Sequence, residues 1–150
     1  MKAAREVISR AESILIHPPA RPGSIDPRWL ALIEVGDLIE DHPDEVWPFV
    51  LRWGSHPDDD IRAAVAACLL EHLLEHHFEA YFPLVQNAVM DPLFADTFSL
   101  CWKFGQAEIP ENAERFDRLI RETALRRGLR FEVQGQEPKV KSDDPGWSPL

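Results

Sequence analysis

The sequence contains little glycine, little cysteine and no long apolar run, and each shortage narrows the functions that it can encode. The seven glycines include none of the closely spaced groups that form phosphate-binding loops. The two cysteines, Cys68 and Cys101, stand alone in apolar stretches, as reduced and buried thiols do. No segment approaches the length of a membrane span, and the charged N-terminus lacks the apolar run of a signal peptide. We therefore expect a soluble, cytoplasmic protein.

Positive charge is scarce in the middle of the chain. The 150 residues carry a formal net charge of −10, and residues 31–109 hold 15 acids but only three lysines and arginines. Residues 110–130 reverse this balance with six arginines. A negative surface repels phosphate backbones and attracts basic partners, although it also keeps proteins soluble without any partner. The charge pattern therefore favours a basic protein or peptide as the partner and disfavours nucleic acid.

Prolines divide the chain into seven segments whose apolar residues recur with helical spacing, and almost no stretch alternates as a strand does. Asp26-Pro27 and Asp91-Pro92 have the composition of helix starts, and Gly128 that of a helix end. The sequence therefore predicts an all-α protein, with one helical domain over residues 1–131 and a flexible tail over residues 132–150. The predicted helical segments are 3–16, 26–41, 43–55, 56–77, 78–90, 91–105 and 110–128.

Residues 46–76 have the most regular pattern, VWPFVLRWGSHPDDDIRAAVAACLLEHLLEH. A short helix, a turn with proline and aspartates, and an Ile-Arg pair precede an alanine-rich helix. This order resembles the HEAT repeat, and turn prolines 30 and 35 residues apart suit such hairpins. The resemblance implies a HEAT-like α-solenoid of about three helical hairpins plus a terminal helix. It also implies that Arg62 bridges the turn aspartates of adjacent repeats.

The segment EHLLEHH allows two interpretations. His72 and His76 are four residues apart, so both imidazoles could reach one metal ion. A zinc site needs further ligands, however, and on a regular helix we expect Glu71 and Glu75 to point away from the imidazoles. The order of residues also differs from HExxH. We therefore expect the histidines to line a packed or partly open inner surface without a metal, and any further role stays open.

Two stretches, RWGSHPDDDIRAAV and FSLCWKFG, are distantly similar to segments of DNA glycosylases built from HEAT-like repeats. The similarity implies a nucleic-acid enzyme. Those enzymes need a basic surface for DNA, whereas this chain has its largest acidic excess in the same region. No nucleophile elbow accompanies these stretches either. We therefore expect no catalytic residue and no cofactor, and we keep a glycosylase-type enzyme as the alternative function.

The candidate site is a set of acidic clusters at or near the predicted turns. Because equivalent turns of stacked repeats share an edge, we expect these clusters to form one negative surface. The sequence therefore predicts a non-catalytic module that binds a basic protein and neutralises or scaffolds it, as immunity proteins do. The partner's identity and the oligomeric state stay open. The candidate residues are Asp37, Glu40, Asp41, Asp44, Glu45, Asp58, Asp59 and Asp60.

Overall fold

The computed structural model describes residues 3–17, 26–126 and 128, and these residues form helices and no strand. The all-α prediction is confirmed for this part of the chain, while the predicted tail, 132–150, lies outside the described residues. No helix in the described ranges is both long and apolar enough to cross a membrane. The elements are α1 (Ala4–Leu15), α2 (Pro27–Gly36), α3 (Pro43–Trp53), α4 (Asp59–Val65), the π-helical turn η1 (Ala66–Leu70), α5 (Glu71–His76), α6 (Phe78–Ala88), α7 (Pro92–Ser99), the 3-10 turn η2 (Gly105–Glu108) and α8 (Pro110–Arg126).

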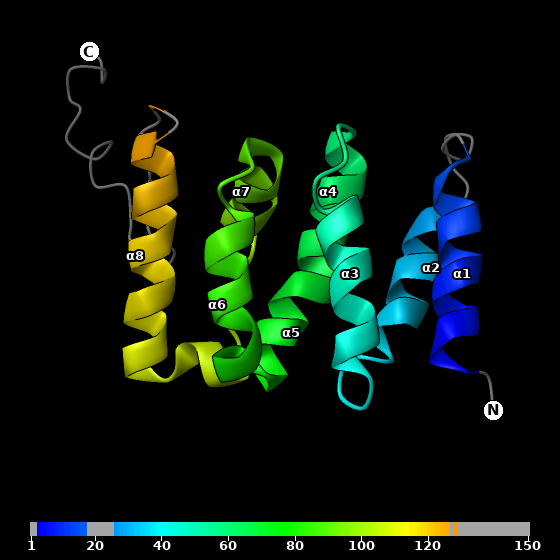
Figure 1. The fold of residues 1–150 in the computed structure, drawn as a ribbon, viewed down its shortest axis with the longest axis horizontal. Coiled ribbons are helices and arrows are strands. Elements are labelled where there is room, and N and C mark those ends of the chain that lie inside the picture. Colours follow the sequence, from blue (N-terminus) through cyan, green and yellow to red (C-terminus); the bar gives the residue numbers. More distant parts are fainter. Residues whose placement is uncertain (1–2, 18–25, 127, 129–150) are drawn as a thin grey trace, which may run out of the picture.

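The helices stand in two layers along the long axis of the molecule (Figure 1). Helices α1, α3, α6 and α8 lie side by side in one layer, and α2, the continuous α4–η1–α5 helix and α7 lie in the other. Successive helices run in opposite directions, so alternate loops lie at the same end. The upper end in Figure 1 holds loops 54–58 and 89–91, and the lower end holds loop 37–42 and segment 100–109.

Each helix of the second layer begins at an aspartate. The side chains of Asp26, Asp58 and Asp91 each accept a hydrogen bond from the backbone N–H two residues further on. A carboxylate in this position satisfies an N–H that the helix leaves unpaired, and it lies at the positive end of the helix dipole. The helix starts that Asp26-Pro27 and Asp91-Pro92 predict are therefore confirmed.

The long helix from Asp59 to His76 is continuous but not regular, because its middle turn, Ala66–Leu70, is π-helical. A π turn places one extra residue in the helix and rotates all later side chains by about 100° relative to a regular helix. The expected faces of EHLLEHH assumed a regular helix. The rotation moves His72 and His76 away from the core, so that both are half-buried at the surface, while Leu73 and Leu74 fill the core.

Helix α7 ends at Ser99, earlier than the predicted end at residue 105. Beyond it, Cys101 is buried and the Trp102 N–H donates to Glu71 Oε2 at 2.9 Å. Glu71 is itself only 6% exposed, and burial raises the pKa of its carboxyl, an effect that the Trp102 bond only partly offsets. A buried carboxylate without a donor is costly, so Glu71 stabilises the non-helical backbone at Trp102. A tertiary contact therefore ends the helix.

Candidate protein-binding site

The structure divides the predicted acidic surface between the two ends of the molecule (Figure 1). The upper end, where α4 begins, holds Asp58, Asp59 and Asp60. The lower end, formed by loop 37–42 and the first turn of α3, holds Asp37, Glu40, Asp41, Asp44 and Glu45. Helix α3 separates the two groups by its 11 residues, a length of about 16 Å. The expected single surface is therefore wrong, since the turns before and after one helix lie at opposite ends of it.

Arg28 of α2 is buried and contacts aspartates at the upper end of the molecule. Its side chain is buried, and it contacts Asp26 Oδ2 at 3.2 Å and Asp58 Oδ2 at 3.6 Å. The hydrogen bond from Arg28 lowers the pKa of the Asp26 carboxyl. Arg28 thus ties the start of α2 to the start of α4. This role of Arg28 was not predicted from the sequence, although its place two positions after the cap Asp26 was a usable signal.

Arg62 makes the corresponding link between α4 and α7. Its buried guanidinium donates to Asp59 Oδ1 at 2.5 Å and to Asp96 Oδ2 of α7 at 2.9 Å. It also donates to the carbonyl oxygens of His56 and Pro57, at 2.8 and 3.0 Å. The bridge between neighbouring helical pairs expected of Arg62 is present, although it reaches Asp96 in the helix and not a turn aspartate. Asp58 and Asp59 therefore each pair with a buried arginine, whereas Asp60 is exposed and forms no ion pair among the described residues.

The five acids of the lower end, called the acidic end below, have no such cationic partners. All five are exposed, and within the described residues no lysine or arginine forms an ion pair with any of them. Glu40 and Glu45 contact only histidines, His76 at 3.5 Å and His42 at 3.7 Å. Because these charges are neither buried nor compensated by lysine or arginine, the acidic end presents a negative surface to solvent.

Asp44 differs from the other four because it also supports the fold. Its carboxylate accepts a hydrogen bond from the hydroxyl of Tyr81 on α6, a residue that is 4% exposed. Burial, together with this bond and the charge of Asp44, raises the pKa of Tyr81 to about 12. The hydroxyl therefore remains a donor at neutral pH and joins α6 to the first turn of α3.

A groove runs between α2 and the η1–α5 segment and opens onto the acidic end. It consists of two hollows of about 330 and 360 Å³ that share Gly36, Asp37 and His72. We call it the α2–α5 groove. Its apolar part is lined by Ile33, Ala67 and Cys68, and its acidic part by Asp37, Glu40 and Asp41. Neither the groove nor the role of Ile33 was predicted from the sequence, because the groove forms only where α2 packs against the η1–α5 segment.

The histidines of EHLLEHH lie on the wall of this groove. His72 Nδ1 lies 2.7 Å from Glu75 Oε1, and its ring stacks on Phe104 with 6.1 Å between centroids. His76 Nε2 lies 3.5 Å from both Glu75 Oε1 and Glu40 Oε2. The expectation that Glu75 points away from the imidazoles is therefore wrong. Within the described residues, no group of three or more histidine, cysteine, aspartate or glutamate side chains is arranged to hold a metal ion.

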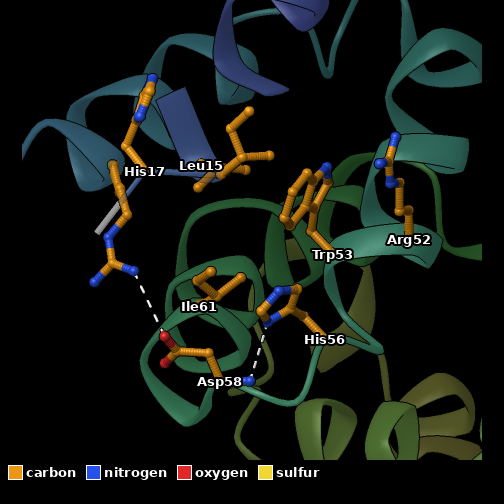
Figure 2. A pocket seen from close by; sticks show the side chains of 9 residues that line it. Leu15, His17, Arg52, Trp53, His56, Asp58 and Ile61 are labelled. Carbon is orange, nitrogen blue, oxygen red and sulfur yellow. Dashed lines mark hydrogen bonds and ion pairs between the residues drawn. The ribbon is translucent and has the colours of Figure 1, made fainter. Parts of the chain in front are cut away.

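A larger pocket of about 610 Å³ lies at the upper end, lined in part by His17, Trp53, His56 and Asp58 (Figure 2). Its arginines, His56 and Asp58 have partners, whereas the Trp53 Nε1 atom is buried and makes no hydrogen bond among the described residues. His56 Nδ1 accepts from the Asp58 N–H at 3.0 Å, and the lining arginines pair with Asp58 and Glu12. One wall also ends at His17, next to residues 18–25, which lie outside the described residues. The α2–α5 groove and the acidic end therefore remain the better candidate.

The two tryptophan-bearing stretches that resemble glycosylase segments do not meet. Trp53, at the upper end of α3, is 3% exposed, whereas Trp102, beyond the lower end of α7, is 58% exposed. A shared site for a nucleobase would need both indoles on one surface. No family model matches the chain, and no curated protein and no solved structure matches it either.

Proposed function

We propose that this protein is a non-catalytic helical-repeat module of the HEAT type that binds a basic protein partner through its acidic end. The observation that carries the proposal is the contrast between the two ends. Asp58 and Asp59 are held by Arg28 and Arg62, while the acidic end has no lysine or arginine partner among the described residues. Uncompensated negative charge costs some stability through repulsion, and a basic partner would relieve that repulsion.

The repeat interpretation is supported by equivalent residues in successive helical pairs. Asp26, Asp58 and Asp91 cap the three helices of the second layer in the same way. Arg28 and Arg62 each connect one of these helices to the next. Repeats that contact their neighbours through equivalent positions form extended arrays, and such arrays offer long surfaces to other proteins.

The proposal is tested by neutralising Asp37, Glu40 and Asp41 together, as Asp37→Asn, Glu40→Gln and Asp41→Asn. Asp44 is left intact because it holds Tyr81. The matched control removes the same charge from exposed acids elsewhere, as Glu6→Gln, Glu108→Gln and Glu122→Gln. Affinity capture from native lysate supplies the partner, which is then titrated by calorimetry against the wild type and both variants at low and high salt.

We expect the acidic-end variant to bind roughly tenfold more weakly, since three exposed pairs contribute about 0.2–1 kcal/mol each. The control should bind like the wild type, and salt should weaken the wild-type complex. Equal affinities for the two variants would refute the proposal. Tight, salt-sensitive binding of DNA by the wild type would instead support the glycosylase-type alternative.

A further inference from the structure

The α2–α5 groove changes character along its length. Its apolar part is open, since Ile33 is 52% exposed and Ala67 is exposed on the opposite wall. Its lower part carries Asp37, Glu40 and Asp41, and none of these has a lysine or arginine partner among the described residues. An isoleucine of that exposure contributes little to the fold and much to any partner that covers it.

The shape of the groove depends on two unusual features of the backbone. Gly36 lies close to the facing helix, where a Cβ would come 3.0 Å from the carbonyl oxygen of Cys68. The facing wall is the π-helical turn Ala66–Leu70, which presents Ala67 and Cys68 to the groove. Such turns are costly in regular helices and are frequent at functional sites. Gly36 therefore allows the two helices to approach each other, and the small, exposed side chain of Ala67 leaves the space beside this contact open.

We infer that the α2–α5 groove binds a partner segment in which an apolar side chain is followed by lysine or arginine. The inference rests on the proposed function and assigns the place and the chemistry of recognition. The apolar side chain contacts Ile33, Ala67 and Cys68, and the cation lies among Asp37, Glu40 and Asp41. Ile33 and Asp37 are one helical turn apart, about 6 Å, which an extended peptide spans in about two residues.

Charge complementarity selects this occupant. Phosphate groups and acidic peptides would be repelled by the lower part of the groove, and a wholly apolar segment would leave its carboxylates without a counter-charge. A second copy of the chain also carries arginines on α8, at positions 115, 118 and 121. Self-association is therefore measured alongside peptide binding.

The test selects random twelve-residue peptides on the immobilised full chain and titrates the best synthetic peptide by fluorescence anisotropy. The key comparison is Ile33→Asp in the groove against Leu30→Asp, an equally exposed residue of the same helix that does not line it. Asp41→Asn is paired with Glu45→Gln, which removes one charge from the acidic end outside the groove. Ala67→Arg fills the groove from the opposite wall. It replaces Ile33→Asp as the test variant if Ile33→Asp lowers the helicity of the protein.

We expect the enriched peptides to combine apolar with basic residues, and Ile33→Asp or Ala67→Arg to weaken binding about tenfold or more. Leu30→Asp should stay within about twofold, and Asp41→Asn should have a larger effect than Glu45→Gln. Bound peptide should also slow alkylation of the half-buried Cys68, with the buried Cys101 as an internal reference.

Other outcomes separate the two proposals. If Asp41→Asn and Glu45→Gln weaken the binding of basic peptides equally and Ile33→Asp does not weaken it, the groove is not the binding site. The acidic end then remains as the binding surface. A failure to enrich basic peptides would contradict the proposed function as well. Concentration-dependent self-association in analytical ultracentrifugation, lost in Ile33→Asp, would assign the groove to a second copy and also overturn the inference.

Discussion

Replacing Arg62 by alanine should loosen the contact between α4 and α7 and destabilise the fold. Arg62 is 6% exposed, and its guanidinium makes five hydrogen bonds, two to loop carbonyls, two to Asp96 and one to Asp59. Within the part of the chain that the structure describes, no other side chain donates a hydrogen bond to the carbonyl oxygens of His56 and Pro57. The side chain thus links the 54–58 loop, the start of α4 and α7 at one point.

The magnitude follows from what each partner loses. The two carbonyl bonds are worth about 1 kcal/mol each, and the half-buried Asp96 pair about 1 kcal/mol more. Asp59 regains water at once, because its side chain is 86% exposed, so its pair adds almost nothing. The expected loss is therefore about 3 kcal/mol, which lowers Tm by roughly 10 °C in a chain of this size.

Urea denaturation followed by circular dichroism measures this loss, with Arg118→Ala as the control. Arg118 is 53% exposed and pairs only with Glu114 within α8, so its replacement should cost at most about 0.5 kcal/mol. Arg62→Lys should recover part of the loss, because an ammonium can keep one ion pair but cannot reach both carbonyls and Asp96 together. A cost for Arg62→Ala no larger than for Arg118→Ala would refute the bridging role.

Three further outcomes are expected. Leu73→Ala should lower the free energy of unfolding by about 2–5 kcal/mol in the same assay, since Leu73 is fully buried. A loss below about 1 kcal/mol would show that Leu73 is not part of the core. Glu71→Gln should raise Tm at pH 7, because the pKa of the Glu71 carboxyl is raised in the folded state, so that its protonated form favours folding and this contribution is lost as pH rises through the folded-state pKa. The gain in Tm should therefore shrink toward pH 4.5. A gain that does not depend on pH would contradict the burial of the charge. Gly105→Ala should lower the free energy of unfolding by about 1–3 kcal/mol, since residue 105 has a φ of 51° and a Cβ there would lie 2.7 Å from Glu75 Cγ. Gly128→Ala should lower it less, because residue 128 has a φ of 73° but open space around it. Equal losses would show that backbone strain alone, without the contact to Glu75, explains the effect.

Local chemistry determined most of the helix boundaries. An aspartate or proline at a helix start satisfies or removes a backbone N–H within three residues, so Asp26, Asp58, Asp91 and the adjacent prolines are readable without any tertiary information. Apolar residues at helical spacing also indicate which face of a helix is buried, and Leu69 and Leu73 of the long helix are both fully buried.

The site depended on contacts between distant parts of the chain. Arg28 and Arg62 determine which acids are paired. Both arginines contact acids at the upper end, and neither contacts an acid of the acidic end. The acids lie at two different ends of the molecule because the loops before and after a helix are at its opposite ends. The amino-acid composition carries no information on this arrangement.

The sequence by itself determined where the helices begin, because a helix start depends on residues within one turn of it, and the composition alone makes the protein acidic. Tertiary packing decided the rest. The π turn at Ala66–Leu70 rotates His72 and His76 out of the core, and the approach of Gly36 to the Cys68 carbonyl shapes the groove beside them. Helical periodicity assumes a constant 3.6 residues per turn, so the one extra residue of a π turn changes every face that follows it.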